Sequence, residues 1–302
     1  MIALLLLTFA VASDQEAPSS AEQRGKPFWK EVARECDVPP WATPSGLVHE
    51  AITLVASPDP EWRDDIGYSV VAACVQKKQR LNAAERRSLV EPLVLSLRKG
   101  IGETDNDSVL QRSFAALSLS ILAAAELREP ALDGPGYRRL LDDALAYLRD
   151  ERDLRGFEPR VGWIHATAHT ADLLKFLARD SRFTPEDQAR LFEAAWTRMA
   201  ASSAPAFTHA EDERLAAALV SVVRRDDFEA SRLDGWLQRF ATLEKQVWAK
   251  SPPDPQVLDA AQNARNLLRS FYVLLSLPQP PATAGQAAAR DKLLVTLQQI
   301  RR

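Results

Sequence analysis

Two of the four histidines in this 302-residue sequence lie four residues apart, in a segment whose residue types could do chemistry. On an α-helix, at about 100° per residue, His165, His169 and Asp172 fall within roughly a 60° arc of one face. Two imidazoles and a carboxylate on one face could bind a metal ion, move a proton, or hydrogen-bond to each other between packed helices. The spacing alone does not decide among these three hypotheses.

A divalent metal such as zinc is one candidate occupant of this cluster. Imidazoles at positions i and i+4 can chelate one metal ion, and Asp172 could be a third ligand or a hydrogen-bond acceptor for a ligand histidine. The catalytic glutamate that follows the first histidine in zincins is replaced by Ala166, which argues against a zincin. In a metal-assisted hydrolase, Glu151 or Asp153 would then be the general base.

The charged segment Glu151–Gly162 leads directly into the histidines and contains Gly156 and Pro159, which predict a loop. A buried polar group left without a partner costs about 1–3 kcal/mol, and this loop is the nearest source of partners. We therefore expect the loop to fold back over the His/Asp face, with Arg155 or Asp153 in contact with it.

Three arginines are candidates for binding a small anionic ligand. Arg112, Arg155 and Arg214 could each hold an anion by two parallel hydrogen bonds. The alternative is that Arg155 and Arg214 pair with nearby carboxylates and hold neighbouring helices together.

The elements that must position these side chains are helices, because nearly every segment after residue 26 has helical periodicity. Helix starts are marked by N-cap residues before proline and by capping-box spacing. The prolines follow Thr43, Asp59, Thr184 and Asp254, and the capping boxes are Asn82 with Glu85 and Thr208 with Glu211. These signals predict eleven or twelve helices, at roughly 26–36, 44–56, 60–79, 83–101, 106–128, 136–151, 163–180, 185–202, 209–224, 227–250, 255–277 and 285–301.

Short connections between so many similar helices predict an all-α fold of antiparallel helix pairs. A pair of roughly 40 residues has the size of a HEAT or armadillo repeat, and we expect such pairs to stack as one domain over residues 26–302. A compact multi-helix bundle is the alternative, since no internal sequence repeat is visible.

The first residues predict export. Residues 1–12 are uncharged and apolar and end in Ala10-Val11-Ala12, which is typical of a signal peptide cleaved near Ala12, although no Lys or Arg precedes the apolar run. Residues 13–25 then form a polar leader. A mis-assigned start or a buried first helix is the alternative. In an exported, periplasmic protein Cys36 and Cys74 can form a disulfide, and in a cytosolic protein they would be two small buried side chains.

The charge balance and the length of the first apolar run argue against nucleic acid as a partner and against a transmembrane span. A formal net charge of -3 gives no reason to expect nucleic acid. The apolar run at the start is shorter than the roughly 20 residues that a membrane-spanning helix needs, so we expect no transmembrane span in the mature chain.

Several short motifs occur in an order that resembles a bacterial family known as domain of unknown function 2785 (DUF2785). They are Asp107–Phe114, Glu151–Phe157, the block from Gly162 to Asp172, Glu211–Leu215 and Asn266–Ser270, and the resemblance covers about residues 50–275. It implies an all-helical, HEAT-like fold and no known activity. The signature positions that it marks are Arg112, Glu151, Asp153, Arg155, Trp163, His165, His169, Asp172 and Arg214.

These observations lead to two hypotheses about function. The first is an exported helical-repeat module that binds a protein or a small anionic ligand, with Trp163 and the three arginines in the binding surface. The alternative is a metal-assisted, hydrolase-like enzyme built on the His165, His169 and Asp172 cluster.

Overall fold

A computed structural model describes residues 21–200, 205–277 and 283–300 of the chain. The predicted signal peptide and most of the polar leader therefore lie outside the described residues. The described chain is mostly helical, with one small two-stranded sheet, as the periodicity predicts. The elements are η1 Glu22–Arg24, α1 Gly25–Glu35, α2 Pro44–Leu54, η2 Glu61–Tyr68, α3 Ser69–Val71, η3 Ala72–Lys77, α4 Ala83–Arg98, α5 Ser108–Glu126, α6 Gly134–Asp150, β1 Phe157–Glu158, β2 Gly162–Trp163, α7 Ala166–Leu177, α8 Pro185–Ala200, α9 Glu211–Val223, η4 Ala230–Arg232, α10 Leu233–Val247, α11 Pro255–Ser276 and α12 Ala284–Gln299.

Most of the predicted helix starts are confirmed by their capping contacts. The Thr43 hydroxyl accepts a hydrogen bond from the Gly46 amide, and Asn82 and Glu85 form the reciprocal capping box. Asp254 likewise caps α11 through the Gln256 amide. Thr43 and Asp254 are each followed by proline at the first helical position, where its missing N–H is one that the helix would leave unpaired.

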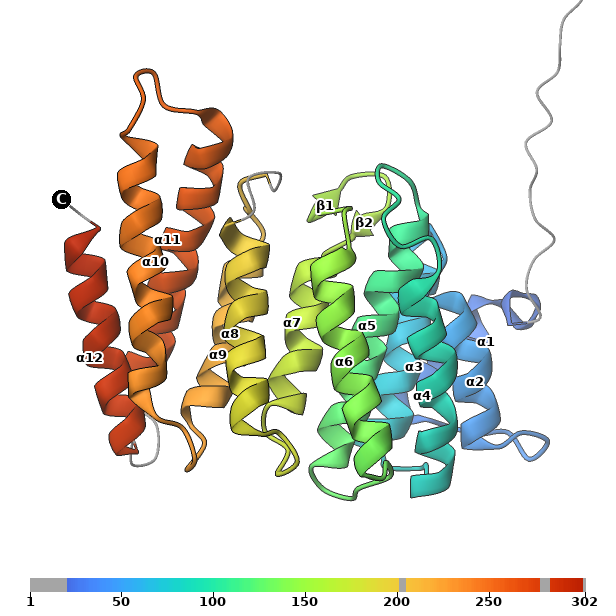
Figure 1. Ribbon diagram of the computed structural model, residues 1–302. Helices are drawn as coiled ribbons and strands as arrows, with labels where there is room; N and C mark the ends of the chain where they lie inside the picture. Colours follow the sequence, from blue (N-terminus) through green and yellow to red (C-terminus); the bar gives the residue numbers. More distant parts are fainter. Residues whose placement is uncertain (1–20, 201–204, 278–282, 301–302) are drawn as a thin grey trace, which may run out of the picture.

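The helices from α4 to α12 form two layers, one in front of the other in the view of Figure 1. In the back layer α5 packs against α7, α7 against α9, and α9 against α11. In the front layer α4 contacts α6, α6 contacts α8, and α10 contacts α12, while each front helix also contacts a back-layer helix. The helix pairs starting with α4, α6 and α8 begin at Ala83, Gly134 and Pro185, so each pair is longer than the predicted unit of roughly 40 residues.

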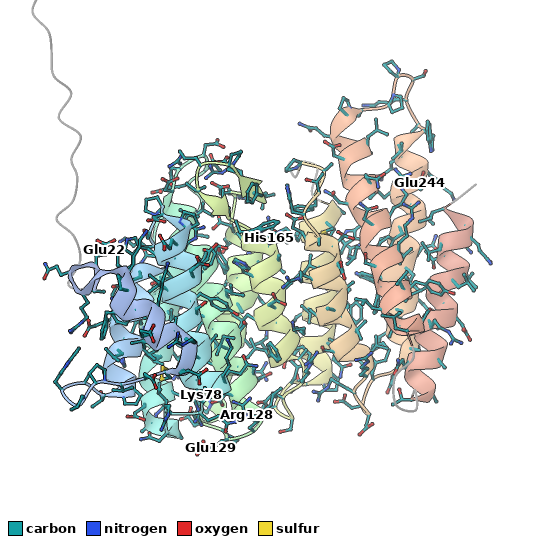
Figure 2. All side chains as sticks on the ribbon, turned by 180° about the vertical axis from the view of Figure 1, so that it is seen from behind. Glu22, Lys78, Arg128, Glu129, His165 and Glu244 are labelled. Carbon is teal, nitrogen blue, oxygen red and sulfur yellow. A yellow bond between two sulfur atoms is a disulfide. The ribbon has the colours of Figure 1, made fainter. Side chains whose placement is uncertain are left out.

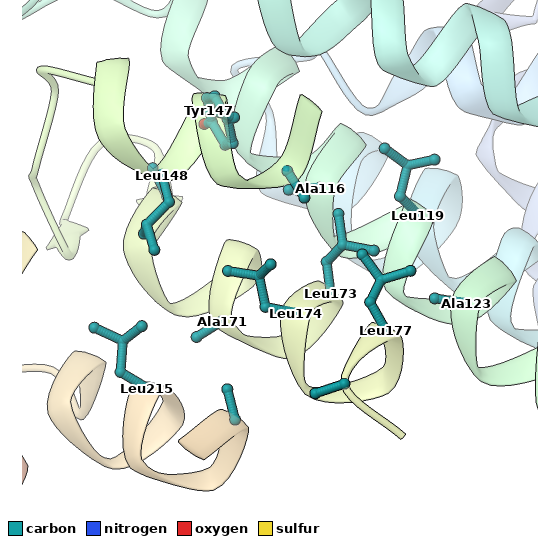
Figure 3. Close-up of a cluster of buried hydrophobic side chains, with 14 of the residues drawn as sticks. Ala116, Leu119, Ala123, Tyr147, Leu148, Ala171, Leu173, Leu174, Leu177 and Leu215 are labelled. Atoms are coloured by element: carbon teal, nitrogen blue, oxygen red, sulfur yellow. The ribbon is translucent and has the colours of Figure 1, made fainter. Parts of the chain in front are cut away.

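One hydrophobic core runs between the layers, from Ala21 to Ile300. Figure 3 shows its centre, where Leu174 of α7 lies between Leu215 of α9 and Leu119 of α5, with Leu148 of α6 in the same cluster. All four leucines are almost completely buried, and each contributes about 1.5–3 kcal/mol of hydrophobic free energy relative to exposure. Helix α7 therefore lies at the middle of the packed structure.

Ion pairs join each front-layer helix to the next one. Each is partly exposed and contributes at most about 1 kcal/mol, so the pairs set the alignment of neighbouring helices more than the stability of the fold. They are Arg98 with Asp143, Arg190 with Asp142, Arg138 with Asp187, Arg239 with Glu193 and Lys292 with Asp234.

The two cysteines are joined. Cys36 at the end of α1 and Cys74 in η3 form a disulfide, with their Cα atoms 5.0 Å apart. Both are buried between α1 and the helical segment that contains η3. Of the two states that the sequence left open, the structure contains the disulfide.

Helix α5 is long and apolar enough to cross a membrane by length and composition alone. However, 83% of its most apolar window is buried inside the protein, and the central helix of a soluble core passes the same test. The absence of a transmembrane span stays a prediction.

Loops at one edge of the molecule precede every back-layer helix. We call it the upper edge: residues 99–107 before α5, 151–165 before α7, 205–210 before α9 and 248–254 before α11 (Figure 1). Figure 2 labels His165 at this edge, and Lys78, Arg128 and Glu129 at the opposite one. The sequence-predicted site thus lies where the back-layer helices begin.

Candidate functional site

A buried ion pair anchors the loop that leads to the histidines. Arg112 of α5 and Glu151 at the end of α6 are both almost completely buried, with Nε–Oε2 at 2.6 Å and Nη2–Oε1 at 3.1 Å. Glu151 Oε1 also accepts a hydrogen bond from the Asp153 amide at 2.9 Å. Arg112 Nη1 donates to Ser108 Oγ at 2.8 Å and to the Lys99 carbonyl at 3.2 Å. Removing either partner would leave a buried unpaired charge, at a cost of about 3–5 kcal/mol.

A second pair holds the next turn of the loop. The Asp153 carboxylate accepts from Arg155 Nη2 at 2.6 Å and from the Asp105 amide at 3.1 Å. Arg155 also donates to Glu158 at 3.0 Å and to the Asn106 carbonyl at 2.8 Å. The hydrogen bond to Asp153 raises the pKa of Arg155 above its usual value.

These contacts bear on four of the predicted site residues. Glu151 and Asp153, the predicted general bases, each accept hydrogen bonds from an arginine and from backbone amides. Arg112 and Arg155, predicted to bind an anion, are the arginines that they pair with. The arrangement fits the structural alternative for these arginines, and it leaves none of the four side chains free for a ligand.

The rest of the loop forms a short β-hairpin that the sequence pattern did not predict. Residues Phe157 and Glu158 pair with Trp163 and Gly162 in antiparallel register. Phe157 and Trp163 are therefore cross-strand neighbours, with ring centroids 5.1 Å apart at an angle of 69°. These two residues remain 45% and 42% exposed, while Ile164 and His165, which follow the second strand, are buried.

The histidine helix starts three residues later than predicted. Residue His165 has the left-handed backbone angle φ 55, and α7 begins only at Ala166. The cause is the hairpin, because the chain must reverse between β2 and the helix: the His165 amide donates to the Arg155 carbonyl at 3.2 Å, and the Ile164 amide to the Gly156 carbonyl at 2.9 Å. The expected contact between the loop and the histidine segment is thus present, but it is made by backbone atoms.

The His165 ring lies between the hairpin and the start of α9. It stacks on Trp163, with centroids 4.8 Å apart and an interplanar angle of 23°. Its Nε2 lies 2.5 Å from the His209 carbonyl oxygen, and because a carbonyl can only accept, Nε2 carries the proton. Burial lowers the pKa of His165, so the neutral ring leaves Nδ1 without a proton.

The His169 ring is buried behind His165 and is held by Ser113 of α5. The Ser113 hydroxyl donates to the Ile164 carbonyl and lies 2.8 Å from His169 Nδ1, so it must accept the Nδ1 proton. Burial lowers the pKa of His169 well below its usual value. The ring also contacts Phe114 and His165 edge-on, with centroids at 4.8 and 5.7 Å.

The third predicted metal ligand does not join the histidines. Asp172 pairs with Lys175 at 2.7 Å and with Arg214 of α9. Among the described residues, no three His, Cys, Asp or Glu side chains come together as a metal ion would require. The metal hypothesis stays a prediction, and this placement of Asp172 does not favour it.

The start of α9 completes the site and differs from its predicted form. The N-cap of α9 is Ala210, with φ 66, in place of the expected Thr208. The Glu211 carboxylate accepts from the His209 amide at 2.8 Å, and this left-handed turn directs the His209 carbonyl at His165. The His209 ring contacts Trp163 at 5.7 Å and 84°.

Sequence reasoning missed two contributors to this site, Phe157 and Ser113. The six-residue spacing of Phe157 and Trp163 around a Pro- and Gly-containing turn is the signal that could have indicated a hairpin with a cross-strand aromatic pair. Ser113 carries no local signal, because its partner is 56 positions away.

The fold and this site define a mostly helical, two-layered protein with an aromatic and imidazole cluster where its back-layer helices begin. The family described as "Protein of unknown function (DUF2785)" matches residues 97–273, which is more than half of the chain. The chain belongs to this family, as its motifs predicted, although the match begins later than the expected residue 50. No curated protein and no solved structure matches the chain.

Proposed function

We propose that this protein is an exported, HEAT-like helical-repeat module that binds another protein through its upper edge. Helical-repeat proteins stack helix pairs so that long surfaces are available to partners, and the two layers described above have that general plan. The proposal takes up the first of the two functions that the sequence suggested.

The observation that carries this proposal is the exposure of Phe157 and Trp163 on a braced hairpin. Large aromatic side chains that stay about half exposed on a rigid support are typical of binding surfaces, because ordering them costs little further entropy when a partner docks. Two other exposed apolar residues, Ile101 and Trp248, belong to the loops of the same edge. The edge thus has several apolar anchors for one extended partner.

A protein partner is favoured over a small anionic ligand. Arg112 and Arg155 are engaged by Glu151 and Asp153, so the three-arginine site that the sequence suggested is reduced to Arg214. The Arg214 side chain is 47% exposed and is itself paired with Asp172. The metal-assisted hydrolase draws no support from the site, since both of its predicted bases are buried in ion pairs.

Export is the second part of the proposal. It is supported by the apolar residues 1–12 and by the Cys36–Cys74 disulfide, because disulfides persist in oxidising compartments such as the periplasm. Mass spectrometry of the protein from its native host should show a new amino terminus at Ser13. An intact Met1 in the soluble cytoplasmic fraction would contradict export.

Photo-crosslinking in the native host tests the binding surface. A photoreactive amino acid at position 163 should give a discrete adduct with another protein. The matched control is position 127, because Leu127 is exposed to a similar extent, 40%, at the carboxyl end of α5. Identical adducts at both positions, or none at position 163, would overturn the proposal.

A further inference from the structure

Three aromatic rings from separate segments meet at nearly right angles on the upper edge. Trp163 of β2 is flanked by Phe157 of β1 at 69° and by His209, from the loop before α9, at 84°. The centroids of these two rings lie 5.1 and 5.7 Å from the Trp163 centroid. His165 stacks on Trp163 nearly parallel and supports it from the buried side. Phe157 and Trp163 are both about half exposed, so this packed cluster presents aromatic surface at the upper edge.

Three other partly exposed tryptophans have a cation over the ring. Arg24 lies 4.6 Å from the Trp41 centroid, Lys26 lies 5.4 Å from Trp62, and Arg239 lies 4.6 Å from Trp196. Within the part of the chain that the structure describes, no lysine or arginine occupies this position over Trp163. Among the described residues, Trp163 shares with the exposed Trp248 an indole that has no cation over it, and Trp163 is in addition surrounded by the rings of Phe157, His165 and His209.

The cations around Trp163 are held elsewhere. Arg155 is bound to Asp153, Arg160 to Asp107, and Arg214 to Asp172. A carboxylate lies close by, since Glu211 Oε1 is 3.6 Å from His165 Nε2. That carboxylate is buried, so it contributes negative potential beneath the cluster, and the exposed aromatic surface of Trp163 and Phe157 is what an outside cation can reach.

We propose that Trp163, Phe157 and His209 form an aromatic cage for a cationic group of the partner, either a quaternary ammonium or the side chain of lysine or arginine. Cation–π attraction is strongest over tryptophan, and desolvation within several rings increases it. This inference rests on the proposed function, because it names the chemistry by which the upper edge recognises its partner.

Isothermal titration calorimetry with choline tests the cage on the oxidised, full-length mature protein. The control ligand is 3,3-dimethylbutanol, which has the same shape but a neutral carbon in place of nitrogen. We expect choline to bind with a Kd on the order of 1 mM and the neutral analogue to bind at least about 5-fold more weakly. Equal binding of the two ligands, or no binding of choline, would overturn the cage.

Matched tryptophan variants locate the binding. Trp163→Leu should abolish choline binding, and Trp163→Phe should weaken it while retaining it, because phenylalanine keeps a π face. Trp41→Leu is the control, since Trp41 is 61% exposed and lies between α1 and α2, outside the four loops of the upper edge, and it should bind choline as the unsubstituted protein does. A melting curve establishes that each variant is folded. Unchanged binding by a folded Trp163→Leu variant would refute the assignment.

Different results would refute the proposed binding surface and the proposed cage. If choline does not bind while position 163 still crosslinks to a protein, the cage is wrong and the binding surface stands. If position 163 gives no specific adduct, the binding surface is wrong whatever choline does.

Discussion

At the residue scale, the site depends on close packing between the hairpin and the start of α9. A Cβ atom added at Gly156 would lie 2.4 Å from His209 Nδ1, closer than Cβ atoms normally approach, and 3.0 Å from Glu211 Oε1, which is a tight contact. Because the His209 carbonyl also binds His165, a shift at His209 would disturb the whole cluster.

We therefore expect Gly156→Ala to destabilise the protein by about 1–3 kcal/mol, which is typical of overpacking. Gly235→Ala is the matched control, because Gly235 lies inside α10 with nothing within 4 Å of the added atom, and there alanine should stabilise by about 0.5–1 kcal/mol. Urea denaturation of both variants provides the measurement. Equal effects of the two substitutions would show that the hairpin does not rest on His209.

The buried histidine predicts a specific dependence of stability on pH. Burial lowers the pKa of folded His169 well below its value in the unfolded chain, which is about 6.5, so the unfolded state binds the proton more readily. The stability that neutral His169 contributes is complete above about pH 6.5 and is lost as the pH falls below it. Burial also raises the pKa of Asp64 to about 6, which favours the folded state in acid and acts in the opposite direction.

A comparison of variants isolates the histidine from Asp64. The His169→Asn variant keeps an amide donor near Ser113, but its side chain cannot be protonated between pH 5.5 and pH 7.5. When the pH is lowered from 7.5 to 5.5, the melting temperature of the variant should fall less than that of the unsubstituted protein, because the variant has no His169 to protonate. If both proteins lose the same stability between these two pH values, His169 does not titrate as described.

At the element scale, α7 and α9 begin in the same unusual way. Their N-cap residues, His165 and Ala210, both have left-handed backbone angles, φ 55 and φ 66. For a residue with a Cβ atom this conformation costs roughly 1–2 kcal/mol. The cost is offset by hydrogen bonds that the two turns make possible. The His165 amide donates to the Arg155 carbonyl, and the His209 carbonyl accepts from the His165 ring.

Glycine at position 210 should relieve this cost. We expect Ala210→Gly to leave the melting temperature unchanged or to raise it slightly, while Ala217→Gly, in the middle of α9, should cost about 1 kcal/mol. Differential scanning calorimetry of the two variants measures both changes. A clear loss of stability in Ala210→Gly, as large as that in Ala217→Gly, would be evidence against the left-handed turn.

The helices were largely predictable from the sequence, whereas the site was predictable only in part. Thr43, Asn82 and Asp254 mark helix starts by local capping chemistry, and the structure contains all three caps. The hairpin escaped prediction because two-residue strands show no alternation of apolar and polar residues. The left-handed turn at His165 was missed for a related reason, since only glycine, and to a lesser degree asparagine or aspartate, signals that conformation in a sequence.

At the scale of the whole molecule, the disulfide ties α1 to the segment that follows α2. It spans 38 residues of sequence, and closing a loop of this length stabilises a protein by about 4 kcal/mol through the unfolded state. Reduction, or replacement of both cysteines by alanine, should therefore lower the melting temperature by several degrees. An unchanged melting temperature in reductant, with two thiols then reactive to an alkylating agent, would show that the bond contributes nothing.

Buried ion pairs and exposed aromatic residues have different roles at the upper edge. Buried pairs such as Arg112 with Glu151 hold the fold, and the exposed Trp163 ring that they support is free to meet a partner.

The melting temperatures of two variants, compared with that of the unsubstituted protein, test this difference in roles most directly. Glu151→Ala should lower the melting temperature sharply, because it leaves Arg112 buried and unpaired at a cost of about 3–5 kcal/mol. Trp163→Ala should lower it much less, by the equivalent of about 1–2 kcal/mol, because 42% of the residue is already exposed and no buried charge is left unpaired. If Trp163→Ala destabilises the protein as much as Glu151→Ala does, the ring serves the fold and the account is contradicted.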